Sequence, residues 1–190
     1  MLAYIFWHWP QANVDRDLYR THLKEFHEVL AKNKPGGFHY STVFEISKTP
    51  WLATDGSVFE DWYLVEGSAA LDPLNDGAIS GACEEPHNRV AREAADGTAG
   101  LYRLRDGTLN LAEARRATWL SKPGGWSYGK FYESTHPIIK DHGAALWGRQ
   151  MTLGPTTEFC MMSRLPINLP PGVVGHEIQL ETVWSGGLKQ

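Results

Sequence analysis

Two stretches of the sequence repeat one pattern, in which a helix with a histidine near its end leads through a short turn into a strand-like segment. The first is FHEVLAKNKPGGFHYSTVF, residues 26–44, and the second is THPIIKDHGAALWGRQMTL, residues 135–153. The two stretches align without a gap, and His27 corresponds to His136. A gapless match over helix, turn and strand indicates that the chain contains two copies of one structural unit.

The first copy shows the order strand, helix, strand, strand, helix, strand. Its clearest helix spans residues 12–34, where apolar side chains recur at helical spacing up to Leu30 and Pro35 ends the pattern. Alternating or β-branched segments predict strands at 3–9, 38–46, 60–67 and 99–107, and residues 68–97 predict two short helices. This order is typical of a ferredoxin-like βαββαβ unit.

The second copy repeats the order but loses one helix. It predicts strands at 117–123, 145–153, 156–165 and 176–184 and a helix at 128–143, while the prolines of 166–175 forbid a regular second helix. We therefore expect an α+β fold with two ferredoxin-like units, residues 1–107 and 108–190, which together form one compact domain. Each unit would bury the open face of its sheet against the other, giving a barrel-like core with helices outside.

The segments FHEVLAKNKPGGFHY and THPIIKDHGAAL resemble the helix, turn and strand of the dimeric α/β-barrel superfamily, and within it of EthD-like proteins. The resemblance implies two sheets packed face to face. Members of the superfamily include cofactor-free isomerases, cyclases, decarboxylases and monooxygenases, and also haem enzymes. The facing sheet that members usually obtain from a second subunit is here part of the same chain, so we expect a monomer or a homodimer.

Composition excludes several classes of function. The net charge is −4 and no basic block stands out, which argues against a nucleic-acid partner. The longest apolar runs are too short to cross a bilayer, and the start of the chain lacks the features of a signal peptide, so we expect a cytoplasmic protein. The two cysteines imply no disulfide framework. Eight tryptophans, seven tyrosines and seven phenylalanines suit a pocket for a small aromatic or apolar molecule.

His27 is the first candidate for catalysis. On a helical wheel it lies at the edge of the apolar stripe, where a cleft between helix and sheet would open, and His136 has the same position in the second copy. A histidine at such a boundary can exchange protons with a ligand near neutral pH. The alternative is a half-buried structural histidine bonded to a backbone carbonyl.

The strands supply the other candidates. His39 and Tyr40 point to opposite faces of their strand, so one of them is expected in the pocket. We expect Phe38, Tyr40, Thr42 and Phe44 on one face, and His39, Ser41, Val43 and Glu45 on a face too polar for a dry core. His8 is expected inside the barrel. We predict that this histidine and five large aromatic side chains contact an aromatic ligand. The six residues are Trp7, His8, Trp9, Tyr19, Trp62 and Trp147.

A metal site is not predicted, because His22 and His27 project about 140° apart on their helix. The sequence therefore favours an enzyme without a bound cofactor that performs acid/base chemistry on an aromatic or unsaturated carbonyl compound. Isomerase, cyclase, decarboxylase and monooxygenase reactions all fit this description. Two alternatives remain: a non-catalytic module for small-ligand binding or dimerisation, and a haem-dependent oxidoreductase with His27 or His136 as axial ligand.

Overall fold

The computed structural model describes residues 1–46, 49–52, 56, 58–152, 154 and 156–187. The strands are β1 (Leu2–Pro10), β2 (Phe38–Ile46), β3 (Val58–Val65), β4 (Ala94–Gly107), β5 (Arg116–Leu120), β6 (Ala145–Arg149), β7 (Phe159–Ser163), β8 (Gly175–Gln179) and β9 (Glu181–Ser185). The helices are α1 (Arg16–Asn33), α2 (Leu71–Ala78), α3 (Glu84–Glu93) and α4 (Tyr128–His142), with 3₁₀ turns η1 (Ser68–Ala70), η2 (Gly81–Cys83) and η3 (Leu111–Glu113).

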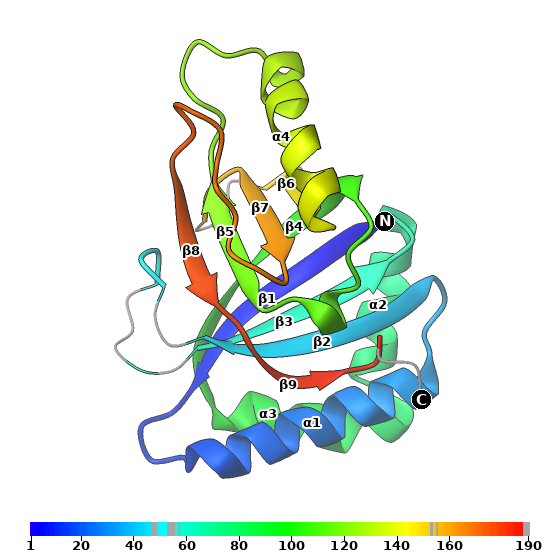
Figure 1. Cartoon of the computed structure of the whole chain (residues 1–190). Helices are drawn as coiled ribbons and strands as arrows, with labels where there is room; N and C mark the ends of the chain where they lie inside the picture. Colours follow the sequence, from blue (N-terminus) through cyan, green and yellow to red (C-terminus); the bar gives the residue numbers. More distant parts are fainter. Residues whose placement is uncertain (47–48, 53–55, 57, 153, 155, 188–190) are drawn as a thin grey trace.

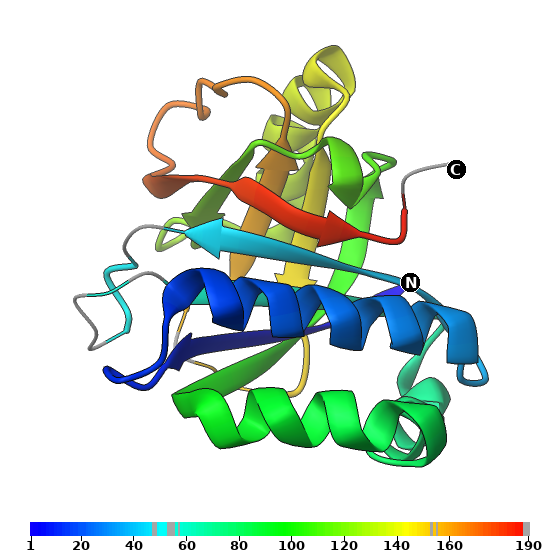
Figure 2. The ribbon, with the colours of Figure 1, turned by 90° about the horizontal axis from the view of Figure 1, so that it is seen from below.

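The strands form one antiparallel sheet in the order β8-β5-β7-β6-β4-β1-β3-β2-β9. The long strand β4 joins its two halves, because its first part pairs with β1 and its last part pairs with β6. The two outer strands, β8 and β9, follow one another in the chain with only Leu180 between them. The sheet therefore closes into a barrel-like shape, with α1, α2 and α3 covering one half and α4 the other (Figures 1 and 2).

Tryptophans fill the space between the two halves of the sheet. Trp7, Trp62, Trp119 and Trp147 are all essentially inaccessible to solvent and belong to one core cluster. Among them lies Glu60, whose carboxylate accepts hydrogen bonds from the indole N–H groups of Trp7 (2.6 Å) and Trp62 (2.5 Å). Burial raises the pKa of Glu60 to about 7, although both hydrogen bonds oppose the shift. The interior of the barrel is thus packed and holds one buried carboxyl group.

The long helix forms where the sequence predicts it, because both of its ends are specified locally. The Asp15 side chain caps the N-terminus by accepting from the Leu18 N–H (2.9 Å), and Lys34 ends the helix in a left-handed conformation with φ 50°. Gly37 follows with φ 73°, and a Cβ there would lie 2.6 Å from the Cβ of Ala70. A glycine is therefore required where the chain turns from α1 into β2.

The remaining predicted helices and strands are present, but their bounds differ: β4 begins at Ala94, within the stretch predicted as helical, and β6 ends at Arg149 although the sequence predicts a strand over 145–153. α2 and α3 are the two short helices expected within 68–97, and residues 164–174, all described, contain no helix. Residue 153, predicted as the end of a strand, lies outside the described residues. The predicted closing strand at 176–184 is divided into β8 and β9, and β9 leaves its own half to pair with β2. Cys83 and Cys160 are both buried and unpaired.

The predicted faces of β2 are only partly correct. The ladder between β2 and β3 shifts register between Phe38 and Tyr40, so these two side chains do not share a face. Phe38 packs with Phe26 of α1, whereas Tyr40 packs with Phe44 against the interior of the barrel.

The expectation that Ser41, Val43 and Glu45 would line a wet cavity or face solvent is wrong. All three are buried, and Val43 packs in a cluster with side chains of α1. Glu45 is neutralised by Arg16 and Arg20 of α1, and the distance to Arg20 Nη1 is 2.8 Å. A buried carboxylate is tolerated on this face because both of its oxygens are paired with guanidinium groups.

Candidate functional site

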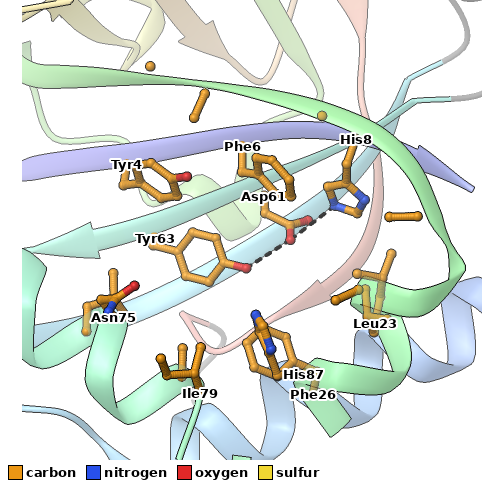
Figure 3. A pocket seen from close by; sticks show the side chains of 18 of the residues that line it. Tyr4, Phe6, His8, Leu23, Phe26, Asp61, Tyr63, Asn75, Ile79 and His87 are labelled. Atoms are coloured by element: carbon orange, nitrogen blue, oxygen red, sulfur yellow. Dashed lines mark hydrogen bonds and ion pairs between the residues drawn. The ribbon is translucent and has the colours of Figure 1, made fainter. Parts of the chain in front are cut away.

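A cavity of about 850 Å³ lies between the sheet and the helices α1, α2 and α3 (Figure 3). Its floor is the outer face of β1, β3 and β4, and His87 of α3 and Asn75 of α2 line the opposite wall. Part of its lining consists of small residues, most of them at the start of β4, namely Ala78, Ala91, Ala94, Ala95, Gly97 and Ala99. These small residues leave room that larger side chains would fill, so the cavity has the size of a ligand pocket.

Asp61 of β3 is the centre of the polar part of this cavity. Its Oδ2 lies 3.1 Å from His27 Nε2, accepts a hydrogen bond from the Tyr63 hydroxyl (3.0 Å) and lies 3.2 Å from His8 Nε2. Asp61 is almost fully buried. Alternation along β3 explains its position, since Asp61 and Tyr63 face the helices while Glu60 and Trp62 face the barrel interior.

The electrostatics of Asp61 keep its carboxyl group ionised. Burial alone would raise the pKa of Asp61, but the imidazoles of His8 and His27 lower it below its ordinary value. Burial and the charge of Asp61 raise the pKa of Tyr63 well above its ordinary value, so that the phenol keeps its proton. Tyr63 therefore donates a hydrogen bond to the ionised carboxylate of Asp61, which holds this carboxylate in place.

His27 lies behind Asp61 and does not line the cavity. Its side chain is fully buried, its Nδ1 is 2.8 Å from the Ser41 hydroxyl, and the indole ring of Trp184 lies 5.6 Å from its own ring. Because an ionised Asp61 can only accept, Nε2 of His27 carries a proton and donates it in the hydrogen bond to Asp61 Oδ2. The expected position at the edge of the helix is therefore wrong, since Trp184 of β9 covers the ring, and His27 orients the carboxylate.

His8 brings an imidazole to the cavity itself. Its Nδ1 is hydrogen-bonded to the Tyr19 hydroxyl (2.7 Å), and burial raises the pKa of Tyr19. Its Nε2 is near Asp61 but not aligned for a hydrogen bond, and neither this nitrogen nor Asp61 Oδ1 has a hydrogen-bond partner in the described part of the chain. Two buried polar atoms without hydrogen-bond partners in the described residues thus belong to side chains at one end of a largely apolar cavity.

The structure brings together three of the residues predicted from sequence, His8, Tyr19 and His27. His8 does not lie inside the barrel as expected, because β1 turns Trp7 inward and His8 toward the helices. Trp62 and Trp147 also face the barrel interior, on the far side of the sheet from the cavity.

The other predicted residues lie elsewhere. Trp9 borders a separate small hollow near Arg16. His39 is exposed on β2, and the Tyr40 hydroxyl accepts a hydrogen bond from the Leu111 N–H at the end of the barrel. His136 projects from α4 with 61% of its side chain exposed and pairs with Asp106 (2.7 Å). Roles for these residues stay predictions, and none of them contacts the cavity described above.

Asp61 and Tyr63 were missed by sequence reasoning. The available signal was the segment EDWYLV, in which two adjacent acidic residues interrupt an otherwise apolar strand. Carboxylates are rare in a strand that is buried on both faces, unless they have hydrogen-bond or charge partners. Because side chains alternate along a strand, two adjacent carboxylates lie on opposite faces of the sheet. The small-residue run AADGTAG at 94–100 was the second signal, since it marks a strand that cannot fill the space beneath its helices.

A haem group does not fit His27. An axial histidine needs one free ring nitrogen directed at open space, whereas both nitrogens of His27 are hydrogen-bonded and its ring is fully buried. In the described ranges, no three or more His, Cys, Asp and Glu side chains gather in a way that could hold a metal ion. The helices in those ranges are all too short or too polar to cross a lipid bilayer.

Comparison with known proteins shows the fold. No protein family model and no curated protein matches the sequence. Solved structures do match. A protein from Fusobacterium nucleatum assigned as a monooxygenase superposes with a TM-score of 0.64 and 6% sequence identity, and the match covers 97% of this chain and 93% of that chain. A Lactobacillus acidophilus protein with the same assignment has TM-score 0.58 and 10% identity, with 97% and 95% covered. An anthrone oxidase-like protein has TM-score 0.53 and 6% identity, with 96% and 93% covered.

These neighbours are members of the dimeric α/β-barrel superfamily, and each is matched over nearly its whole length. The present chain has the same mixed α+β architecture, with a large antiparallel sheet and four helices. Identities of 10% or less define the fold and leave the chemistry to be argued from the site.

Proposed function

We propose that this protein is a small-molecule enzyme of the oxidase or monooxygenase type that needs no tightly bound cofactor. Its substrate would be a flat, enolisable aromatic carbonyl compound bound in the cavity between the sheet and α1–α3. One observation carries the proposal: His8 Nε2 and Asp61 Oδ1 are both buried at the wall of this cavity, and neither atom has a hydrogen-bond partner in the described part of the chain. A polar end in an apolar pocket suits an aromatic molecule with an acidic C–H or O–H group.

His8 is the proposed general base. In the tautomer whose Nδ1–H donates to the Tyr19 oxygen, Nε2 has a free lone pair at the cavity. When Nε2 takes a proton from the substrate, the Asp61 carboxylate 3.2 Å away stabilises the positive charge that forms on the ring. His27 and Tyr63 hold that carboxylate in position and would act as positioning residues.

The reaction can be balanced with dioxygen as the co-reactant. Proton removal from a methylene group leaves an electron pair that spreads into the conjugated carbonyl group. This carbanion reduces dioxygen: one oxygen atom ends in a new carbonyl group, and the other leaves as water with the two methylene hydrogens. The methylene carbon loses four electrons, and dioxygen gains them. An anthrone has this kind of methylene group, which agrees with the name of one structural neighbour.

The finer assignment of the fold belongs to the same proposal. The first half of the chain has the strand order β4-β1-β3-β2, and the second half has the order β8-β5-β7-β6. The two orders are the same when the strands of each half are numbered from the first strand of that half. This supports two ferredoxin-like units, residues 1–107 and 108–190, as in an EthD-like protein fused in tandem. Because β9 already pairs with β2 of the other half, one chain would supply both halves of the barrel, and a second subunit would not be needed to complete it.

Anthrone can test the proposal directly. Under anaerobic conditions, the protein in D2O should accelerate deuterium exchange at the anthrone methylene group, and in air it should accelerate oxygen uptake above the uncatalysed rate. The His8→Gln variant should lower both rates by about 10²–10⁴-fold. His39→Gln, an exposed histidine on β2, is the matched control and should leave both unchanged.

Exchange and oxygen uptake at wild-type rates in His8→Gln would refute the assignment of the base. Tight binding of anthrone by the wild-type protein with no acceleration of either process would favour the alternative, a non-catalytic binding module that uses the same cavity.

A further inference from the structure

Thr152 lines the same cavity, although it belongs to the second half of the chain. It follows β6 and lies beyond β4, on the side of the cavity away from β3. Its hydroxyl oxygen is buried and has no hydrogen-bond partner in the described part of the chain, like His8 Nε2 and Asp61 Oδ1. Leaving a buried hydroxyl without a partner destabilises a fold, so an unpaired group at a pocket wall needs an explanation.

The backbone before Thr152 is held in an unusual conformation. Met151 has φ 61°, which is uncommon for a residue other than glycine, and the Thr152 N–H donates to the Gln150 carbonyl (2.8 Å) across this tight turn. The Met151 side chain is 90% exposed, so packing of Met151 does not stabilise the turn. The residue that follows this uncommon backbone conformation, Thr152, is one of the residues that line the cavity.

The register of the sheet gives the separation between Thr152 and the acid/base group. Phe6 of β1 pairs with Asp61 of β3 on one side and with Ala99 of β4 on the other. The segment that carries Thr152 runs along the far side of β4, where the Gln150 N–H donates to the Leu101 carbonyl (2.8 Å). Asp61 and Thr152 are thus about three strand spacings apart, or about 14 Å between backbones.

We propose that Thr152 is the second polar anchor of the substrate, and that the substrate is a rigid molecule of two or three fused rings with an oxygen function at each end. One end meets His8 and Asp61, and the other accepts a hydrogen bond from the Thr152 hydroxyl. This inference rests on the proposed function for the identity of the first end. A cavity of about 850 Å³ accommodates a molecule of this size.

In the proposed reaction, the Thr152 hydroxyl stabilises negative charge that develops on the substrate. When a proton leaves the substrate at the His8 end, negative charge spreads through the conjugated rings to an oxygen at the other end. A hydroxyl donor placed there stabilises that charge by a hydrogen bond. Thr152 therefore determines which ring systems bind in register with the base, and the second half of the chain contributes directly to specificity.

Two naphthols form a matched pair of probes, because they differ only in the oxygen at the far end. We would measure the binding of 2-naphthol and 2,6-dihydroxynaphthalene by fluorescence. The wild-type protein should bind the diol about 3- to 10-fold more tightly, which is the contribution of one hydrogen bond. Thr152→Val, which keeps the shape of the side chain and removes the hydroxyl, should bring this ratio to about 1, whereas Thr152→Ser should retain it.

Thermal unfolding of the ligand-free variants supplies an independent readout. Thr152→Val should be at least as stable as the wild type, because it removes a buried hydroxyl that has no partner. An affinity ratio that Thr152→Val leaves unchanged would overturn the anchor while leaving the proposed base intact. If neither naphthol binds the wild-type protein, the aromatic substrate class itself is refuted, and the anchor with it.

Discussion

Replacing His27 with alanine tests whether this histidine holds the site together or reacts in it. The substitution removes a fully buried ring whose two nitrogens contact Ser41 Oγ at 2.8 Å and Asp61 Oδ2 at 3.1 Å. The Ser41 hydroxyl loses its hydrogen-bond partner, and the Asp61 carboxylate loses a donor while it remains buried and charged. Each loss costs about 1–3 kcal/mol, and breaking a buried charged pair costs about 3–5 kcal/mol. We therefore expect a total loss of about 3–5 kcal/mol.

The assay is chemical denaturation at neutral pH followed by tryptophan fluorescence, which reports on the four buried tryptophans of the barrel. For a chain of this length, a loss of this size corresponds to a fall in Tm of about 10 °C. His27→Ala combined with Asp61→Asn should recover about 1–3 kcal/mol relative to the sum of the single changes, because the neutral amide needs its partner less. His39→Ala is the control on an exposed site and should change stability by no more than about 0.5 kcal/mol.

The result that would refute this reasoning is specific. If His27→Ala unfolds at the same denaturant concentration as the wild type while turnover falls by about 10²-fold or more, His27 takes part in the chemistry. The inference that it positions Asp61 would then be wrong.

Two further predictions concern Glu60 and His136. Burial raises the pKa of Glu60 from 4.5 to about 7, so the folded protein binds this proton more tightly than the unfolded chain does between those values. At about 1.4 kcal/mol per pH unit, the free energy of unfolding should fall by about 3 kcal/mol as the pH rises from 4.5 to 7. Glu60→Gln should remove this slope in pH-dependent denaturation, and equal slopes in both proteins would contradict the assignment. His136→Ala should change the free energy of unfolding by no more than about 0.5 kcal/mol and should leave turnover unchanged, because the His136 side chain is 61% exposed and does not line the cavity. A loss of turnover in this variant would show a second site.

The sequence predicts the fold well where local signals and long-range packing agree. The capped helix from Arg16 to Asn33, its buried stripe and the strand after it all follow from spacing and turn residues. The same patterns predict His8, Tyr19 and His27 as site residues. His8 and His27 contact Asp61, and Tyr19 is hydrogen-bonded to His8, because β1, α1 and β3 are neighbours in the fold.

What the sequence does not predict depends on contacts between distant segments. The shift of register at Phe38 depends on how β2 pairs with β3, and nothing in β2 itself marks it. The pairing of β9 with β2 covers His27 with Trp184, which turns an expected boundary residue into a fully buried one. The cavity depends in part on small side chains, and small side chains that leave space unfilled produce no periodic pattern in a sequence.

The two halves differ in how they cover their sheets, and this difference explains why the site lies beside α1, α2 and α3. In the second half α4 packs directly on the sheet, and the segment that replaces the second helix adds Ile167, Leu169 and Val173 to the same apolar cluster. In the first half the two short helices lie over a stretch of β4 that carries small residues, and a cavity remains between these helices and the sheet.

The second half nevertheless completes the site of the first. It supplies Trp184, whose ring covers His27, and Thr152, whose hydroxyl lines the cavity. It also supplies Glu181, which pairs with Arg20 of α1 at 2.8 Å and so ties β9 to the helix that carries His27. Substitutions in β9 or in the turn before Thr152 therefore act on the same cavity as substitutions around Asp61, although no histidine of the second half lines it.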